Sequence, residues 1–154
     1  MAVFGVAVAE VLQLEGGRSA DAGGLTKYGI AQAAHPGRNV ATLTEAQAVA
    51  IYDTEYWQPY GYAALRDQAL ATKVFSLAVN MGPRTAHRLL QQALLRLGVV
   101  VPACPGRLSS DTLAQVNGAP AGVLLDLLRV QAAHYYLALN QPRFERGWLR
   151  RALM

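Results

Sequence analysis

The sequence predicts a mainly α-helical domain with one small β element near the amino terminus. Apolar side chains recur at spacings of three and four over much of the chain, as at Leu70, Val74 and Leu77, which is the spacing of a core-facing helix. Alternation with a period of two, typical of a strand, occurs between residues 24 and 34. We therefore expect helices on both sides of a short strand or hairpin.

Length and composition favour one folded domain over residues 1–154. A chain of this length buries a core without the help of a disulfide or a metal. With 53% hydrophobic and 16% charged residues, the chain is not expected to be disordered. No apolar run reaches the roughly 18 residues that a membrane-spanning helix needs. We therefore expect a protein without a membrane span.

A carboxylate stands at the end of the first predicted helix. Phe4, Val8 and Leu12 follow helical spacing, and eleven residues at about 100° each bring Glu15 back to within roughly 20° of Phe4. Glu15 is therefore expected to point with the apolar face of that helix. A partly desolvated carboxyl group in such a position is suited to act as a general acid.

Two glycine pairs follow Glu15, and Asp21 lies between them, ahead of the hydroxyl of Thr26. The glycines allow the backbone to turn sharply after the helix. Cleavage of a glycosidic bond needs one acid that protonates the leaving oxygen, and a second polar group that directs water or stabilises the positive sugar carbon. The stretch from Glu15 to Ile30 therefore carries the predicted catalytic residues.

The motifs Glu-Gly-Gly at 15–17 and Asp-Ala-Gly-Gly-Leu-Thr-Lys-Tyr-Gly-Ile at 21–30 resemble the signature of the glycoside hydrolase family 108 muramidases. That family includes phage endolysins and bacterial secretion-activator proteins. The resemblance extends over nearly the whole chain, through residues 43–52, 56–57, 74–83, 89–94 and 147–151.

The resemblance implies a lysozyme-like helical fold in which Glu15 is the catalytic acid. The expected activity is that of an N-acetylmuramidase, which cleaves the β-1,4 glycosidic bond between N-acetylmuramic acid and N-acetylglucosamine in peptidoglycan. Residues 1–82 are then expected to form a catalytic lobe with Glu15 and the hairpin. Residues 83–154 are expected to form a helical lobe that resembles a peptidoglycan-binding region.

Two positions depart from the family pattern. The loop after Glu15 is shorter than in most members and lacks an Asn-Asp-Pro, which leaves Asp21 as the only carboxylate between Glu15 and Thr26. Ser76 follows Phe75 at a position where the family often has Asp. The sequence therefore leaves open which groups assist Glu15.

The rest of the chain predicts further helices with short connections. Thr44 and Gln47 are spaced as a capping box, and Pro83 suits the first turn of a helix. The expected helices cover residues 44–56, 67–81, 83–97, a short segment from 110, and 120–139, with an irregular loop at 98–109 and a short aromatic, basic tail after Pro142.

Aromatic residues are concentrated between Tyr52 and Tyr62. Such rings stack on sugar faces while their polar tips bond hydroxyl groups, but they also form packing seams, which we expect of Tyr52 and Trp57. Asn80 either satisfies backbone at a helix end or, by resemblance to the family, lines the substrate cleft. The candidate substrate-binding residues are Tyr28, Tyr56, Tyr60 and Asn80.

The cysteine and histidine residues give no sign of a disulfide or a metal site. Cys104 is the single cysteine, so an internal disulfide is impossible. His35, His87 and His134 match no metal-ligand spacing, which argues against a zinc amidase or zinc peptidase. We expect neither a metal nor another cofactor.

Charge is divided unevenly along the chain. Residues 1–66 carry a net charge of −2 and residues 67–154 a net charge of +6. A basic half suits the anionic polymers of a cell wall or nucleic acid, and it is otherwise a solvated surface. Because no nucleic-acid recognition motif is present, we expect no nucleic-acid partner.

The apolar amino terminus lacks the basic segment that begins a signal peptide. We therefore expect a protein that is made in the cytoplasm and reaches the periplasm and cell wall through a holin or a dedicated export system. We also expect it to be a monomer.

The sequence hypothesis is an endolysin-like peptidoglycan hydrolase in which Glu15 is the general acid. Thr26 is expected to hold the attacking water, and Asp21 either assists it or orders the hairpin. A lytic transglycosylase is an alternative, because one catalytic glutamate is also its minimal equipment. A catalytically silent wall-binding or secretion-accessory protein is a second alternative, which applies if the shortened loop disables the site.

Overall fold

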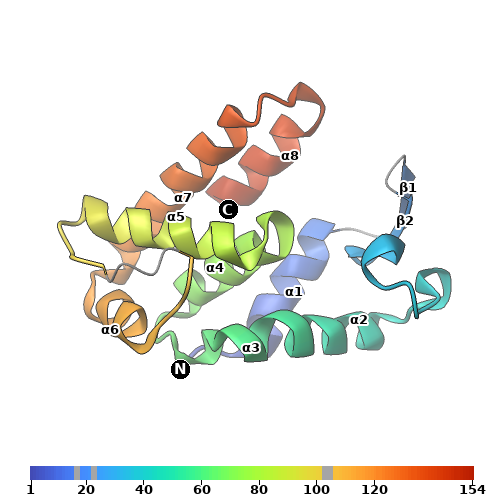
Figure 1. The fold of residues 1–154 in the computed structure, drawn as a ribbon, viewed down its shortest axis with the longest axis horizontal. Coiled ribbons are helices and arrows are strands. Elements are labelled where there is room, and N and C mark those ends of the chain that lie inside the picture. The colour runs from blue at the N-terminus through green and yellow to red at the C-terminus, as the bar shows by residue number, and fades with distance from the viewer. Residues whose placement is uncertain (16–17, 22–23, 102–105) are drawn as a thin grey trace.

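The computed structural model describes residues 1–15, 18–21, 24–101 and 106–154, with the backbone alone for residues 18–21. The described part consists mainly of helices, with one small sheet directly after the first helix, so the fold class that the sequence predicts is confirmed (Figure 1). The longer helices are α1 (Phe4–Glu15), α2 (Glu45–Tyr52), α4 (Gln68–Met81), α5 (Pro83–Arg96), α6 (Ser110–Gly118), α7 (Ala121–Ala138) and α8 (Pro142–Leu153).

The sheet has three antiparallel strands in chain order, β1 (Arg18–Asp21), β2 (Gly24–Lys27) and β3 (Ile30–Ala31). Thr26 lies in the middle strand, opposite Ser19 on one side and Ala31 on the other. Tyr28 and Gly29 connect β2 to β3 with φ angles of 51° and 76°. Two consecutive positive φ values are typical of a type I′ hairpin turn. The predicted hairpin is therefore present, and its turn lies at Tyr28 and Gly29.

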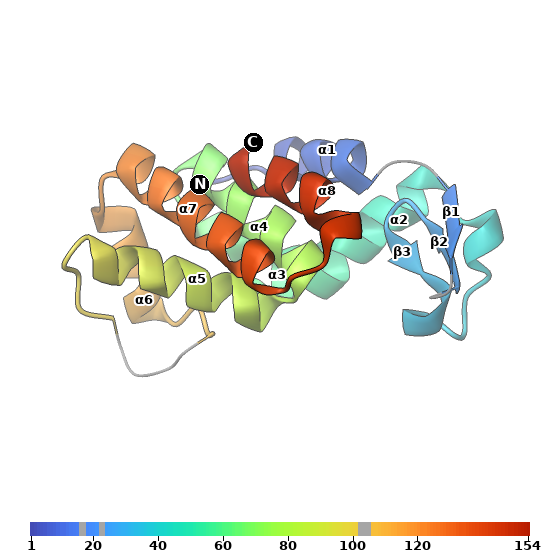
Figure 2. The same ribbon diagram turned by 90° about the horizontal axis from the view of Figure 1, so that it is seen from above.

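Helix α4 is the central element of the fold. It contacts α1, α5, α7 and α8, and Figure 2 shows it between α1 and α5. Every residue from Leu70 to Ala78 is buried, because neighbours cover the helix on all sides. The buried apolar residues form one cluster that extends from Ala2 to Ala152. The division into lobes at residues 1–82 and 83–154 stays a prediction.

The predicted helix from Thr44 is present, with a local change of winding. Thr44 and Gln47 form the expected capping box at its amino end. After Tyr52 the helix continues as a π-helical segment (Asp53–Trp57) and then as α3 (Gln58–Tyr60). Tyr52 and Trp57 are 1% and 4% exposed, so the expectation that both are packing residues is confirmed.

The segment after Pro142 is a twelve-residue helix, which corrects the description of this segment as a short tail. Pro142 occupies its first turn, and Phe144, Trp148 and Ala152 follow one another at a spacing of four, so they share one face. Helix α8 packs against α7 and α4, and Figure 1 shows α7 and α8 side by side. The sequence signal was present in this spacing.

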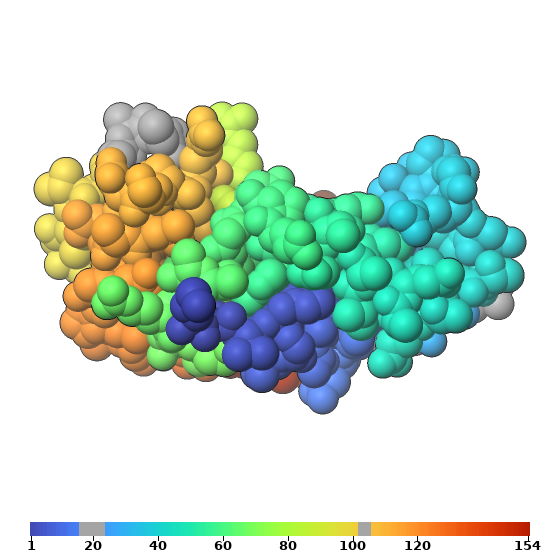
Figure 3. All heavy atoms as spheres, turned by 90° about the horizontal axis from the view of Figure 1, so that it is seen from below, coloured from blue at the N-terminus to red at the C-terminus, as the bar shows by residue number. Residues whose placement is uncertain are grey.

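The surface is hollowed on one side of the molecule. Figure 3 shows the hollow between the cyan segment that follows the sheet and the yellow and orange surface of α5 and α6. Within the described ranges, no helix combines the length and the apolar character needed to cross a bilayer.

We predict that Gly29→Ala destabilises the protein. A Cβ atom at this position would lie 2.6 Å from Glu15 Cγ and in closer contact with Tyr52 Oη, on a backbone with φ of +76°. Backbone strain and overpacking together are expected to cost about 2–4 kcal/mol. Urea denaturation followed by circular dichroism measures this loss.

Gly37→Ala is the matched control, because a Cβ atom there meets nothing within 4 Å. It should change stability by less than about 0.5 kcal/mol. Equal stability of the two variants would show that Gly29 is not required for the close approach.

Candidate active site

Glu15 is the last residue of α1, and its side chain is 18% exposed. Ala7, Val8 and Val11 are the buried residues of the same helix, so the apolar stripe that the sequence predicts is present. Arg151 on α8 donates from Nη2 to Glu15 Oε1 at 2.6 Å. The carboxylate is thus held at the edge of the core by a residue that lies 136 positions later in the chain.

Arg151 is itself fixed at several atoms. Its Nη1 donates to the carbonyl oxygen of Ser76 at 3.1 Å and to Ser76 Oγ at 3.2 Å. Lys73 Nζ donates to the Arg151 carbonyl oxygen at 2.7 Å. With 5% of its surface exposed, Arg151 has little freedom to adopt another conformation. Ser76, one of the two departures from the family pattern, therefore orients the arginine that binds Glu15.

Lys73 adds a second buried cation to this network. It is 2% exposed, and burial lowers the pKa of its ammonium group to about 8. Glu10 opposes this change, while Arg129 and Arg151 add to it by charge repulsion. The positive charge beside Arg151 is therefore reduced in mildly basic solution, while an N–H group remains to bind the carbonyl oxygen.

The turn between β2 and β3 packs against the other side of Glu15. Tyr52 Oη donates to the carbonyl oxygen of Tyr28 at 2.8 Å, and a Cβ atom at Gly29 would collide with both Glu15 and Tyr52. Burial raises the pKa of the Tyr52 hydroxyl, and the negative charge of Glu15 raises it further. The Tyr52 hydroxyl therefore stays protonated at neutral pH and fixes the turn as a hydrogen-bond donor.

Tyr28 precedes Gly29 in the turn that approaches Glu15, and Tyr56 interacts electrostatically with Glu15. The Tyr28 ring packs against the core and lies 5.5 Å from Lys27 Nζ, which donates to a carbonyl oxygen at 3.3 Å. The Tyr56 ring lies 6.1 Å from that of Tyr52. Burial raises the pKa of the Tyr56 hydroxyl, and Glu55, Tyr60 and Glu15 add to the effect. Substrate binding by Tyr28 and Tyr56 stays a prediction.

Tyr60 lies at a different pocket, of about 210 Å³, which is also lined by His87 and Gly106. His87 bonds Tyr62 Oη at 2.8 Å and the Gly106 carbonyl oxygen at 3.1 Å, and burial lowers its pKa. A neutral imidazole satisfied at both nitrogens is a structural group. The described contacts do not join Tyr60 to Glu15, so its substrate-binding role also stays a prediction.

Thr26 and Asp21 lie on neighbouring strands. Thr26 is partly buried on β2, and its hydroxyl has no hydrogen-bond partner among the described residues. Asp21 ends β1 opposite Gly24, but its side chain lies outside the described atoms. The geometry therefore leaves the Thr26 hydroxyl available, and the roles of both residues stay predictions.

Asn80 lies in a groove that reaches the candidate acid. The groove has a volume of about 270 Å³, and we call it the α8 groove; it is lined by Leu14, Asn80, Arg143, Phe144, Gly147, Trp148 and Arg151. Asn80 Oδ1 accepts a hydrogen bond from Tyr136 Oη at 2.7 Å. Arg151 belongs both to the groove and to the ion pair with Glu15, so the two features are continuous.

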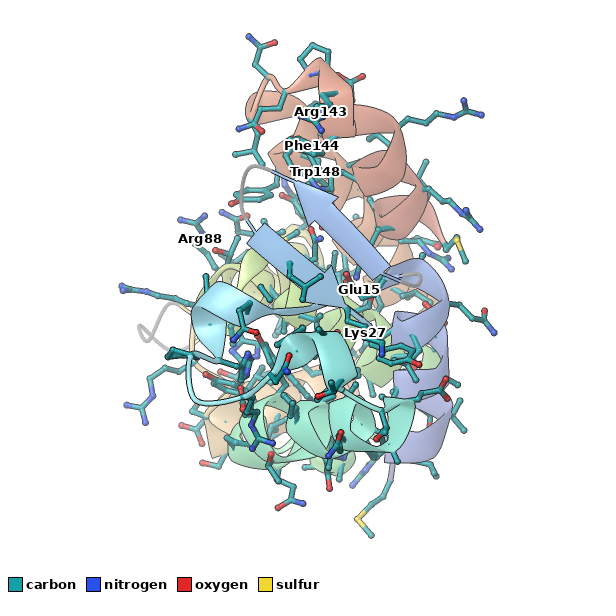
Figure 4. All side chains as sticks on the ribbon, turned by 90° about the vertical axis from the view of Figure 1, so that its right-hand side faces the viewer. Glu15, Lys27, Arg88, Arg143, Phe144 and Trp148 are labelled. Carbon is teal, nitrogen blue, oxygen red and sulfur yellow. The ribbon has the colours of Figure 1, made fainter. Side chains whose placement is uncertain are left out.

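The groove-lining residues of α8 were not among the sequence candidates. Figure 4 shows Arg143, Phe144 and Trp148 on α8, above Glu15 in that view. Their signal was the spacing of four from Phe144 to Trp148, together with the Gly-Trp-Leu-Arg-Arg motif that ends at Arg151. Within the described ranges, no group of three His, Cys, Asp or Glu side chains could hold a metal ion.

A helical domain with a small sheet after its first helix, and with a glutamate between the sheet and the last helix, has a lysozyme-like fold. The solved structure titled "Structure of Brucella abortus SagA" is similar to this chain, with a TM-score of 0.77 and 27% sequence identity. The match covers 97% of this chain and 88% of that chain. Residues 8–82 match the family model described as Glycosyl hydrolase 108. Among curated proteins, none matches the chain.

This match over residues 8–82 confirms the expected resemblance to the glycosyl hydrolase 108 family. At the level of the family, this implies a glycoside hydrolase with peptidoglycan as its substrate. The matched segment contains Glu15, Asp21, Thr26 and Asn80. Arg151 lies outside it, although it bonds the candidate acid directly.

We predict that Arg151→Met lowers the free energy of unfolding by about 1–3 kcal/mol, because it leaves the Glu15 carboxylate and the Ser76 oxygens without their donor. The double variant Glu15→Gln, Arg151→Met should lose less free energy of unfolding than the two single variants lose together. The difference should be at least about 0.5 kcal/mol, because the two side chains interact. Denaturant titration of all four proteins measures this interaction energy.

Arg150→Met is the control, because Arg150 is exposed on the same helix. It is expected to stay within about 0.5 kcal/mol of the wild type. Strict additivity of Glu15→Gln and Arg151→Met would show that the ion pair contributes nothing in solution.

Proposed function

We propose that the protein is an N-acetylmuramidase that cleaves the β-1,4 bond between N-acetylmuramic acid and N-acetylglucosamine, with Glu15 as its general acid. The observation that carries this proposal is the placement of Glu15. Its carboxylate is only 18% exposed, is held by Arg151 on one side and by the turn at Gly29 on the other, and adjoins an open groove. The surrounding residues 8–82 match the model of a glycoside hydrolase family.

The two oxygens of Glu15 have different surroundings. Oε1 accepts from Arg151, whereas Oε2 has no hydrogen-bond partner among the described residues. We therefore assign to Oε2 the proton that the acid form of Glu15 carries, while Oε1 keeps its hydrogen bond from Arg151. The proton passes to the glycosidic oxygen as the bond from that oxygen to the sugar carbon breaks. Arg151 keeps the carboxyl group in one orientation during this step, which favours transfer to a single oxygen.

The second half of the reaction needs a water on the opposite face of the sugar. We propose that the Thr26 hydroxyl holds this water, which attacks the sugar carbon and releases its proton to Asp21 or to solvent. A threonine without an adjacent base is a poor nucleophile, so we infer inversion of configuration at the sugar carbon. Asp21 otherwise orders the hairpin, as aspartate readily does in a turn.

We also propose an endolysin-like, bacteriolytic role. The enzyme would be made in the cytoplasm and act in the periplasm and cell wall, because its substrate lies there. It would act as a monomer. A holin or a dedicated export system would provide access. The cationic half of the chain supports this role, because anionic wall polymers attract a basic surface.

We predict that Glu15→Gln abolishes the release of muropeptides from purified peptidoglycan while the fold is kept. General acid catalysis contributes at least about 10²-fold to rate, so the loss should exceed that factor. Mass spectrometry of the wild-type products should show reducing muramic acid ends. Anhydro ends would identify a lytic transglycosylase, and no products would identify a binding protein. Activity that persists in the Gln variant would remove Glu15 from the mechanism.

We predict that Thr26→Ala lowers kcat by about 10-fold or more with an unchanged melting temperature, because water placement is lost. Thr26→Ser retains the hydroxyl and should recover most of the activity. Proton NMR of the first product formed should show the inverted anomer. A retained anomer, or a covalent glycosyl adduct on Asp21, would show that a carboxylate acts as the nucleophile. It would contradict the proposal that Thr26 holds the attacking water.

A further inference from the structure

The α8 groove is lined by donors and apolar groups and contains no carboxylate. Its polar members are Asn80, Trp148, Arg143 and Arg151, and no Asp or Glu is among the lining residues. Arg151 is already paired with Glu15, whereas Arg143 has no ion-pair partner among the described residues, and such an arginine attracts an anion. The groove therefore has the charge that complements a carboxylate-bearing ligand.

Stacked aromatic rings make the wall of this groove rigid. The Trp148 ring lies 5.3 Å from that of Tyr136 at an interplanar angle of 19°, and 5.4 Å from that of Phe144 at 30°. The Arg143 guanidinium lies 5.3 Å from the centre of the Phe144 ring. Phe144 is 42% exposed, so the stack ends in a free apolar edge next to a positioned cation.

Several donors in the groove have no hydrogen-bond partner among the described residues. Asn80 Oδ1 is occupied by Tyr136, which leaves the Asn80 amide N–H groups unbonded within the described ranges. In the same part of the chain, neither the Trp148 indole N–H nor the Arg143 guanidinium has a hydrogen-bond partner. Donors of this kind in one groove, beside an apolar wall, suit an acetamido sugar that carries a carboxylate.

The groove also has the position required of a substrate subsite. Leu14 and Arg151 line it, and they are the chain neighbour and the ion-pair partner of Glu15. A sugar in the groove therefore lies next to the sugar whose bond Glu15 would cleave. This continuity favours a glycan strand over a separate ligand.

We propose that the α8 groove is the subsite for a muramyl residue, and that Arg143 binds a carboxylate of that residue or of its stem peptide. The inference rests on the proposed function, because it deepens the substrate assignment of the same site. Arg143 would then select acidic peptidoglycan over a neutral polymer of N-acetylglucosamine. Trp148 and Phe144 provide the apolar wall against which the sugar packs.

The test measures binding to the full-length Glu15→Gln variant by isothermal titration calorimetry, so that hydrolysis does not interfere. Three tetrasaccharides are compared: one with stem peptides, one with the peptides removed and the lactyl carboxylates free, and neutral chitotetraose. Adding Arg143→Gln should weaken binding of at least one acidic ligand roughly tenfold, because a charge-assisted hydrogen bond is lost. Chitotetraose binding should not change.

The two acidic ligands identify the source of the carboxylate. Loss restricted to the peptide-bearing strand assigns Arg143 to the stem peptide, and loss with the denuded strand assigns it to the lactyl group. Arg146→Gln is the matched control, because Arg146 is exposed on the same helix but does not line the groove. It should leave all three affinities unchanged.

Trp148→Ala should weaken the binding of all three ligands. If Trp148→Ala fails to fold, Phe144→Ala, which removes a more exposed ring, replaces it and should have the same effect. No binding of any ligand, equal effects of Arg143→Gln and Arg146→Gln, or an equal loss for chitotetraose would overturn the inference. Tighter binding of a free acidic peptide than of either acidic glycan would overturn the muramyl assignment.

These outcomes are separable from failure of the proposed function. A wild-type enzyme that releases no muropeptides but shows the Arg143 effect retains the subsite as a binding site. Normal hydrolysis with an unchanged KM in Arg143→Gln refutes the subsite while leaving the proposed muramidase activity in place.

Discussion

The ion pair between Glu15 and Arg151 is the interaction on which the arrangement of the site depends. It joins the end of α1 to the end of α8, and both helices pack on α4, which supplies Ser76 and Lys73 as the anchors of Arg151. Two side chains that are 18% and 6% exposed cannot exchange partners with water freely. The ends of the chain must therefore come together before the carboxylate has a fixed orientation, which makes the site a product of the whole fold.

A second constraint acts from the sheet. The turn after β2 approaches Glu15 so closely that only a glycine fits at position 29, and the buried Tyr52 hydroxyl holds that turn through a hydrogen bond to Tyr28. Strand β2 also packs on the short 3-10 helices Gln32–Ala34 and Val40–Thr42, and the turn at Gly29 links this unit to Glu15. Rigid support on two sides is what precise proton transfer requires.

Local sequence signals were enough for the helices and for the stripe that carries Glu15. The capping box at Thr44 and the buried ring of Tyr52 follow from spacing and composition alone. The pairing of Arg151 with Glu15 could not be found in this way, because one arginine among several in a basic segment resembles a solvated charge. Its partner is 136 residues away, and no local pattern reports so distant a contact. The same reason hides the burial of Lys73 within an apolar helix.

In the proposed complex, one glycan strand crosses Glu15 with a muramyl unit in the α8 groove. The most direct measurement is a crystal structure of the Glu15→Gln variant with a peptide-bearing peptidoglycan tetrasaccharide. We predict a glycosidic oxygen within about 3 Å of the residue 15 amide. We also predict a muramyl carboxylate within hydrogen-bond distance of Arg143. A tetrasaccharide seated instead in the pocket of Tyr60 and His87, away from residue 15, would contradict this arrangement.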